Sequence, residues 1–411
     1  MKTFFSKIAD TLRRAPRWIY IALALALALI FPMLESWGVM ETLWLRVGTR
    51  ALVYVLLAVG LNLVLGETGL LHLGYVAFWA IGAYTTAILS SPRTARLLYM
   101  VQEHGIGKAL TTVTQRTMQI PEELVGFHVG FGWVLLIAVL VAMLFGFILG
   151  IPTLRLRGDY LAIVTLAFGE ITRITFNNWE PVTNGPGGIP GIMPPNIFGW
   201  VVDKPGEFFY LLLIVVVIVV WLLNNLKNSR IGRAWNALRE DEIAAHHAGV
   251  HSTRVKMLAV VLSAGIAGLA GAIFGYYQQF INPQYFPFMQ STIIVCMVVL
   301  GGMGSIPGAI VGAVALDTLP EVIRQTFTKW LPNAFGPDFL PGVQAAIQTD
   351  FDRYRMLIFG FVVVLMVVFR PEGLLPNKLW RRETHEVDPR EQEQTRQHLF
   401  DLEEGHPDLE A

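Results

Sequence analysis

A cluster of charged residues stands inside an apolar part of the sequence, between Ile231 and Gly249. Apolar and charged residues recur there at helical spacing, which predicts a short amphipathic helix from Arg233 to His247 that lies along a membrane surface. Gly249 is typical of a helix end. Mixed signs of charge suit a protein partner, and a plain interfacial helix is the alternative. The residues expected to contact the partner are Arg233, Trp235, Leu238, Arg239, Glu240, Asp241, Glu242, Ala244, Ala245 and Gly249.

A second group of ionisable residues lies within an apolar run, where charge is costly in a bilayer and indicates either function or a partner. Asp159, Glu170 and Arg173 recur at steps that place them on one face of a helix. Glu170 and Arg173 can therefore pair. Two interpretations stay open, because the pair either lines a transport path or stabilises the helix.

A third group surrounds a glycine-rich turn. The pattern Leu-Gly-x-x-Gly occurs at 65–69 and again at 300–304, and such glycines allow tight turns between half-length helices near a transport site. Close helix packing is the alternative. The complete set of candidate pathway residues is Asn62, Gly66, Glu67, Thr68, His72, Asp159, Thr165, Glu170, Arg173, Gly301, Gly302 and Gly304.

Other chemistry has no support in the sequence. His247 and His251 are four residues apart, but no Cys, Asp or Glu completes a zinc-ligand set, so we expect no metal. The sequence contains no phosphate-binding Gly-x-x-x-x-Gly-Lys-Ser/Thr loop, no Gly-x-Ser-x-Gly motif and no His-Glu-x-x-His motif. The lone Cys296 cannot form an intrachain disulfide. We therefore expect no enzyme and no cofactor bound by this chain.

The elements that position these residues are membrane-spanning helices. Of the 411 residues 54% are hydrophobic and only 15% charged, which indicates an all-α, polytopic integral membrane protein. Runs long enough for a hydrocarbon core of about 30 Å predict about ten helices, some short and broken or re-entrant. They are placed at Trp18–Met33, Thr49–Leu65, Leu70–Leu89, Trp133–Ile151, Asp159–Phe176, Phe208–Leu226, Val255–Gln278, Phe288–Leu300, Ile306–Leu319 and Phe351–Phe369.

The basic residues predict the orientation of these spans. Five cations before the first span hold residues 1–17 in the cytoplasm, and alternating spans return the C-terminus to the same side. Residues 18–376 then form the transmembrane domain, with a cytoplasmic loop at 227–254, and residues 377–411 form a disordered acidic tail. Segments 91–132 and 177–207 lie outside. Lys plus Arg equals Asp plus Glu at 31 each, so no net charge favours nucleic acid.

Five motifs give the chain a resemblance to a known family, the permease subunits of the bacterial branched-chain amino-acid ABC importers, and specifically to the longer of the two permeases. The resemblance covers residues 50–90 and 133–376. The motifs are Gly60–Gly66 with Ala80–Tyr84, Leu154–Glu170, Gly232–Ala245, Val299–Ser305 and Arg370–Pro376.

The resemblance implies an assembly in the bacterial inner membrane. Its members are a second homologous permease, two ATPase subunits that bind ATP and Mg, and a periplasmic binding protein that delivers the substrate. The segment 227–254 would then hold the coupling helix that docks on an ATPase. Ala244, Ala245 and Gly249 match the family's Glu-Ala-Ala-x-x-x-Gly signature, but Ile243 stands where that signature has Glu.

Two alternatives remain at this stage. A permease of the same family would import urea or short-chain amides instead. An ion-coupled secondary carrier would use Asp159, Glu170 and His72 as proton or cation sites and would need no ATPase.

Overall fold

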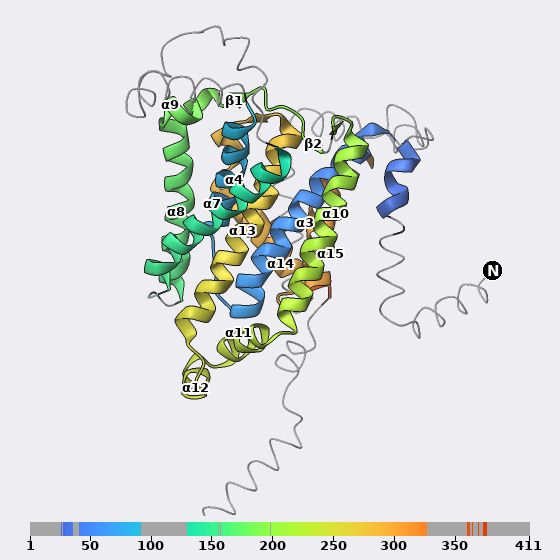
Figure 1. The fold of residues 1–411 in the computed structure, drawn as a ribbon. Helices are drawn as coiled ribbons and strands as arrows, with labels where there is room; N and C mark the ends of the chain where they lie inside the picture. The colour runs from blue at the N-terminus through green and yellow to red at the C-terminus, as the bar shows by residue number, and fades with distance from the viewer. Residues whose placement is uncertain are drawn as a thin grey trace, which may run out of the picture.

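The computed structural model is a bundle of helices that run between two ends (Figure 1). It describes residues 26, 28–35, 41–91, 130–154, 156, 158–197, 199–326, 360–361, 364, 369 and 373–375. The first and tenth predicted spans lie mostly outside these residues, as do the segments 1–17, 91–132 and 377–411 almost entirely.

Eight of the predicted spans are helices in the structure, with ends that differ from the predicted ones by up to seven residues. They are α3 (Thr42–Thr68), α4 (Tyr75–Leu89), α7 (Phe131–Thr153), α8 (Asp159–Asn178), α10 (Pro205–Lys227), α13 (Ser252–Gln278), α14 (Phe288–Gly301) and α15 (Ile306–Gln325).

Helix length divides these elements into two classes. Within the described residues, six helices are long and apolar enough to cross a membrane. One of these six is the helical segment 283–301, which contains the 14 residues of α14. By contrast α4 has 15 residues, short of the roughly 20 that a crossing needs. The expectation of a short helix is therefore confirmed after the first glycine-rich turn, whereas the helical segment that ends at the second turn is long enough to cross.

The core lies around α13, which packs against α3, α4 and α7. Small residues allow these backbones to approach closely: a Cβ on Gly82 of α4 would lie 2.1 Å from the carbonyl oxygen of Gly268. Trp79 of α4 packs against the ring of Phe274 on α13 and against that of Phe286, with ring centroids 4.9 and 5.0 Å apart. The glycines of α13 therefore serve close packing.

The end of the bundle that carries α9 (Glu180–Thr183) holds the little non-helical structure that is described (Figure 1). There β1 (Ile189–Pro190) pairs antiparallel with β4 (Phe280–Ile281), and β2 (Asn196–Ile197) pairs with β3 (Trp200–Val201). Two short 3₁₀ turns, η2 (Gly185–Gly187) and η3 (Pro283–Tyr285), flank them.

At the other end lie two short helices, α11 (Arg230–Glu240) and α12 (Glu242–His247) (Figure 1). The sequence predicts one helix over this segment, and that prediction is wrong. Asp241 adopts an extended conformation, and its carboxylate accepts from the N–H groups of Ile243 and Ala244 at 2.7 and 3.0 Å. An aspartate at this place caps a new helix rather than continuing the old one. Gly249, with φ +87°, follows α12 as expected.

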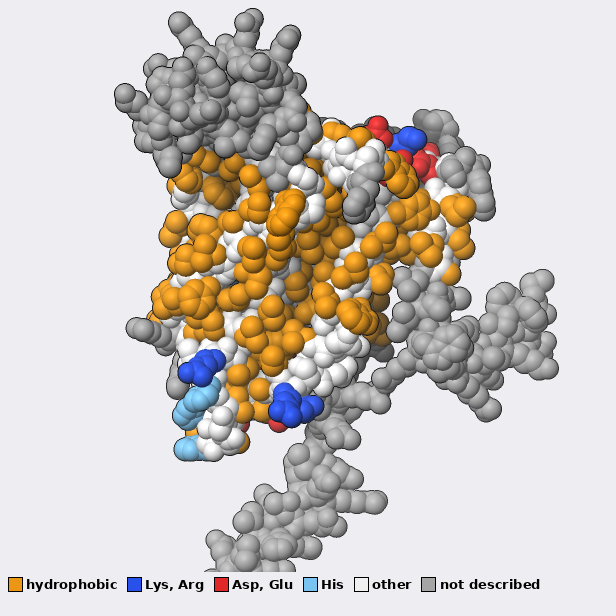
Figure 2. Space-filling view, in the orientation of Figure 1, with side chains coloured by type: hydrophobic (Ala, Val, Ile, Leu, Met, Phe, Trp, Pro, Cys, Tyr) orange, Lys and Arg blue, Asp and Glu red, His pale blue; other side chains and the backbone are white. Residues whose placement is uncertain are grey.

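Helices α7 and α10 turn largely apolar faces outward. The exposed residues of α7 include Leu136, Leu140 and Leu144, and those of α10 include Ile214 and Ile218. Figure 2 shows the resulting apolar surface over the middle of the molecule, with Lys, Arg and His side chains at the α11 end and a small group of acidic and basic side chains at the opposite end. Such a belt is what lipid tails require.

Candidate functional site

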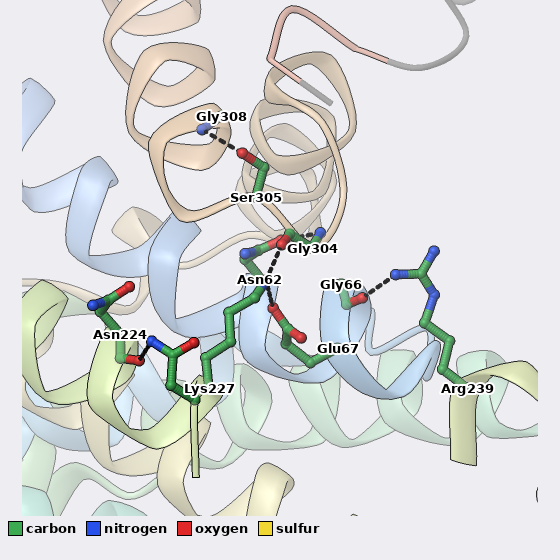
Figure 3. Close-up of polar contacts among 10 residues, drawn as sticks. Asn62, Gly66, Glu67, Asn224, Lys227, Arg239, Gly304, Ser305 and Gly308 are labelled. Carbon is green, nitrogen blue, oxygen red and sulfur yellow. Dashed lines mark hydrogen bonds and ion pairs between the residues drawn. The ribbon is translucent and has the colours of Figure 1, made fainter. Parts of the chain in front are cut away.

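At the α11 end, four elements from three separate parts of the sequence meet through polar contacts (Figure 3). They are the end of α3, the end of α10, helix α11, and the turn between α14 and α15. We call the residues that join them the polar junction. Its members are Asn62, Gly66, Glu67, Lys227, Arg239 and Gly304.

The first link joins the two Leu-Gly-x-x-Gly turns to each other. The side-chain oxygen of Asn62, which is buried, accepts the N–H of Gly304 at 2.9 Å. Gly304 has φ +74°, a conformation that favours glycine. A Cβ on Gly66 would lie 2.3 Å from the nitrogen of Gly304, so the two backbones can approach this closely only because Gly66 lacks a side chain. Ser305 then caps α15 by accepting the N–H of Gly308 at 3.1 Å.

The second link is an ion pair between Lys227 at the end of α10 and Glu67 on α3. Lys227 also donates to the carbonyl oxygen of Gly304. The side chain of Glu67 is 4% exposed and that of Lys227 is 24% exposed. One oxygen of Glu67, Oε2, is buried and has no hydrogen-bond partner in the described part of the chain. The carboxylate therefore depends on Lys227 for its charge compensation.

The third link ties α11 to α3. Arg239 donates from Nη1 to the carbonyl oxygen of Gly66 at 2.7 Å. One turn earlier on the same face of α11, the buried Trp235 donates from Nε1 to the carbonyl oxygen of Val255 on α13, at 2.8 Å. Glu242 at the start of α12 pairs with Lys256 of α13 at 2.7 Å. Both short helices are thus fastened to the bundle.

The predicted contact residues of this segment fall into two sets. Trp235, Leu238 and Ala245 are buried against the bundle, while Arg239 and Glu242 make the contacts just described. The remainder point away from the bundle: Arg233, Glu240, Asp241, Ala244 and Gly249 are exposed. Ile243 beside them is 66% exposed, a large apolar side chain at the tip of the molecule. The outward set is therefore available to another protein.

Several candidate pathway residues lie outside the junction. Thr165 of α8 is buried and accepts the N–H of Leu73 at 3.1 Å, which holds α8 against the α3–α4 connection. His72 in that connection is buried beside Phe78, and its ring nitrogens have no partner among the described residues. The hydroxyl of Thr68 bonds within its own helix, to the carbonyl oxygen of Val64. Gly301 and Gly302 belong to the same turn as Gly304.

The charged residues of α8 face away from the rest of the chain. The helix packs through Thr165, Gly169 and Thr172, which are buried. Asp159 at its first turn is exposed. The expected ion pair is present, with Arg173 Nε 3.1 Å from Glu170 Oε1 and side chains 31% and 36% exposed. Inside a bilayer an ion pair on an outer face needs a polar neighbour, because lipid offers none.

Two charged contacts in the structure were not predicted from the sequence. Lys227 follows directly after an apolar run, and a cation at such a place can turn inward to a carboxylate. Asp317 of α15 is 1% exposed and pairs with Arg50 of α3 at 2.9 Å, 267 residues away. An aspartate in the middle of an apolar run was the signal that a partner must exist.

Across the described residues, no group of three or more His, Cys, Asp or Glu side chains could hold a metal ion. His246 and His247 are both exposed on α12. The polar junction connects α11 to α3, and α3 to α10 and to the α14–α15 turn. A movement of α11 can therefore be transmitted to the membrane helices.

Comparison with known proteins gives consistent findings. The family profile described as "branched-chain amino acid transport system / permease component" matches residues 43–367. The chain is 37% identical over 383 residues to the high-affinity branched-chain amino acid transport system permease protein LivM of Salmonella typhimurium, which covers 87% of this chain and 75% of that protein. The Escherichia coli LivM protein is 36% identical with the same coverage.

A second type of permease is also similar. The LivH permease protein of the same transport system in Salmonella typhimurium is 27% identical over 335 residues, which covers 78% of this chain and 91% of LivH. No solved structure gives a significant match.

Proposed function

This chain belongs to the family of permease components of branched-chain amino acid transport systems, and on that premise we propose that it conducts leucine, isoleucine and valine across the membrane as one subunit of an ABC importer. It is a multi-pass membrane protein with six described helices long enough to cross a bilayer. The substrate rests on the printed names of its relatives and on their 36–37% identity.

The importer has four further subunits in this proposal. A second permease of the LivH type supplies the other half of the channel, which agrees with the similarity of LivH to this chain. Two ATPase subunits bind ATP and Mg, and this chain binds no cofactor itself. A soluble binding protein brings the amino acid to the opposite side of the membrane.

The α11 end faces the cytoplasm in this assignment, within the bacterial inner membrane. Lys227, Arg230, Arg233, Arg239 and Arg254 all lie at this end, which follows the rule that cytoplasmic loops are rich in Lys and Arg. Both termini are then cytoplasmic. The end that carries α9 faces the periplasm and receives the binding protein.

We place the ATPase contact on α11 and α12. The exposed set around Ile243 docks on the ATPase, and the buried set around Trp235 anchors the two helices to α13. A rigid helix that is pushed by an ATPase moves whatever is fastened to it. The observation that carries the proposal is the bond from Arg239 to the Gly66 carbonyl, because it joins the docking helix directly to the turn that meets Gly304.

The polar junction then converts ATPase motion into movement of the membrane helices. Lys227 lies where α10 ends and three residues before α11 begins, and it holds both Glu67 and Gly304. Displacement of α11 therefore acts on α3, α10 and the α14–α15 turn together. Asn62, Gly66, Glu67, Gly301, Gly302 and Gly304 form the cytoplasmic gate of the path in this proposal.

The outer face of α8 lines the path between the two permeases. Glu170 and Arg173 are partly exposed on this face, and a water-filled path or a second permease would supply the polar surroundings that lipid lacks. The outward faces of α7 and α10 carry no such charges among their exposed residues and would meet lipid.

Reconstitution tests the function directly. The chain is co-expressed with its second permease, both ATPases and the binding protein, and the purified complex is placed in proteoliposomes. We expect uptake of radiolabelled leucine that requires ATP inside and binding protein outside. Uptake that instead follows an imposed proton or sodium gradient, without ATP, would favour the ion-coupled carrier. ATP-driven uptake of urea but not leucine would favour the in-family alternative.

A cross-link tests the docking site. Cys296 is the only cysteine of the chain, so C296S gives a cysteine-free background. A cysteine at Ile243, 66% exposed on α12, should cross-link to an ATPase subunit, whereas one at Trp200, 67% exposed on β3 at the opposite end, should not. Equal cross-linking at both positions would contradict the placement.

A further inference from the structure

A cavity of about 290 Å³ opens at the end of the bundle opposite α11, between α3, α13 and α15. None of the candidate pathway residues lines it. Its described lining consists of Leu43, Arg46, Val47, Arg50, Val53, Phe274, Tyr277, Gln278 and Glu321. The volume lies at the lower limit for small-molecule sites, which suits a ligand the size of a single amino acid.

The lining combines two kinds of surface. Leu43, Val47, Val53 and Phe274 supply an apolar wall. The remaining side chains are charged or polar and include two guanidinium groups and one carboxylate. A pocket that is apolar on one side and carries a few placed polar groups is the usual form of a small-molecule site.

One of the two guanidinium groups that line the cavity makes no ion pair with the described residues. Arg50 is engaged by Asp317, with Nε 2.9 Å from Oδ1 and 3.2 Å from Oδ2. Arg46, one helical turn earlier on α3, is exposed and makes no ion pair with any residue in the described ranges. Among the described residues its guanidinium thus has no carboxylate partner, and its planar fork of donors is well suited to bind one.

The carboxylate that lines the cavity, Glu321, has an oxygen atom that can accept a further hydrogen bond. Oε1 of Glu321 accepts from Nη2 and Nε of Arg324 at 2.5 and 3.1 Å, and from Gln325 at 3.2 Å. Within the described residues, Oε2 accepts only from Arg324 Nε, at 3.2 Å. Since an ionised carboxylate offers about four acceptor sites, Oε2 can still take a bond from an ammonium group.

We infer that this cavity receives the amino acid as it leaves the binding protein: Arg46 binds its α-carboxylate, Glu321 binds its α-ammonium, and the wall around Val47 and Phe274 holds its aliphatic side chain. The inference rests on the proposed function, because the orientation given there places the cavity on the periplasmic side. The opposite charges of a zwitterion match the opposite charges of the lining, and a urea molecule would use neither.

The site lies close to elements that move in the proposed cycle. Arg46 and Gly66 stand on the same helix, 20 residues or about 30 Å apart at 1.5 Å per residue. Glu321 and Gly304 likewise mark the two ends of α15 and its preceding turn. A shift of the polar junction therefore reaches the cavity through α3 and α15, which can release the amino acid toward the path.

The test measures how many leucine molecules are transported per ATP hydrolysed by the complete complex in proteoliposomes. R46Q and E321Q should each lower this ratio by about tenfold or more, because each removes a charge-assisted hydrogen bond to the substrate. Binding-protein-stimulated ATP hydrolysis should stay unchanged, since the docking surface is intact. A purely structural role would lower transport and hydrolysis together.

Two matched variants serve as controls. R324Q breaks the same ion pair as E321Q but keeps the Glu321 carboxylate, so its ratio should remain near the wild-type value. K204Q removes a cation at the same end of the bundle, 77% exposed and outside the cavity, and should also have no effect. An unchanged ratio in R46Q and E321Q would overturn the inference, as would equal losses in E321Q and R324Q.

A labelling experiment gives a second readout that does not depend on those variants. In the C296S background, a cysteine at Gln278 lies at the exposed rim of the cavity. Saturating leucine-loaded binding protein should slow its reaction with a membrane-impermeant thiol reagent more than binding protein that carries no leucine. Equal rates would contradict the inference. Absence of ATP-driven leucine uptake by the unmodified complex would instead refute the proposed function.

Discussion

Helices α3 and α15 are joined at both ends, and the two joints differ. At the α11 end, Asn62 and Glu67 of α3 meet the Gly304 turn directly and through Lys227, with the carboxylate almost fully buried. At the opposite end, Arg50 pairs with Asp317 beside an open cavity, and the arginine is 38% exposed. We call the first contact the packed joint, because its side chains are buried, and the second the hollow joint, because it borders the cavity. Buried contacts can transmit movement between the helices, whereas the cavity can hold a ligand.

The largest expected effect comes from breaking the packed joint. K227A leaves the Glu67 carboxylate buried without a cation, which we expect to lower the free energy of unfolding by about 3–5 kcal/mol. Thermal unfolding of the purified protein in detergent measures the loss. The double variant K227M/E67Q removes both charges and should recover most of it. If K227A unfolds like the K204A control, the junction does not hold the helices together.

Breaking the ion pair beside the cavity should lower the free energy of unfolding by less. D317N removes the partner of Arg50, but the arginine can turn to water through the cavity, so we expect a loss of about 1–3 kcal/mol. The unfolding midpoints of D317N and K227A, measured side by side, check the comparison. A larger loss for D317N would reverse the assignment of the two ends.

Loss of the bond between α11 and α3 should uncouple ATP hydrolysis from leucine uptake with a smaller loss of stability. R239M removes the donor to the Gly66 carbonyl, a net stability loss of about 1.5–3 kcal/mol at most for a bond to a charged group. ATPase subunits should still bind, because the outward residues are unchanged. Leucine uptake should fall by more than ATP hydrolysis. Parallel losses of uptake and hydrolysis would mean that Arg239 supports docking and not transmission.

The smallest effect on stability is expected where neither joint is touched. I243D changes an exposed side chain on α12, and exposed positions usually shift stability by less than about 0.5 kcal/mol. The amount of ATPase that co-purifies should nevertheless drop strongly. V201D, exposed on β3 at the opposite end, should keep the ATPase bound. Normal ATPase recovery with I243D would remove α12 from the docking surface.

Most of the fold could be predicted because membrane helices form from local properties. An apolar run long enough to cross the bilayer must satisfy its backbone hydrogen bonds internally, and the helix is the only way for a single segment to do so. The prediction failed at Asp241, where the amphipathic pattern continues across a residue that caps a new helix. A helix cap depends on a single polar side chain and leaves the spacing of the apolar residues unchanged, so the amphipathic pattern does not reveal it.

The site could be predicted only in part. The Leu-Gly-x-x-Gly repeat pointed to Asn62, Gly66 and Gly304, and their contact with one another is a finding of the structure. Lys227 and Asp317 were missed, because their partners lie 160 and 267 residues away. Nothing in the spacing of a sequence identifies a partner at such separation.

The sequence by itself determined that the chain spans a membrane many times, that its helices are interrupted at two glycine-rich turns, and that an amphipathic segment lies outside the spans. These properties are local, because hydrophobic length and glycine conformations act within one or two helical turns. Only the tertiary structure decided that Lys227 holds Glu67, that the two turns touch, and that three helices enclose the cavity around Arg46 and Glu321. Those contacts depend on how helices pack, and packing brings together side chains that the sequence keeps far apart.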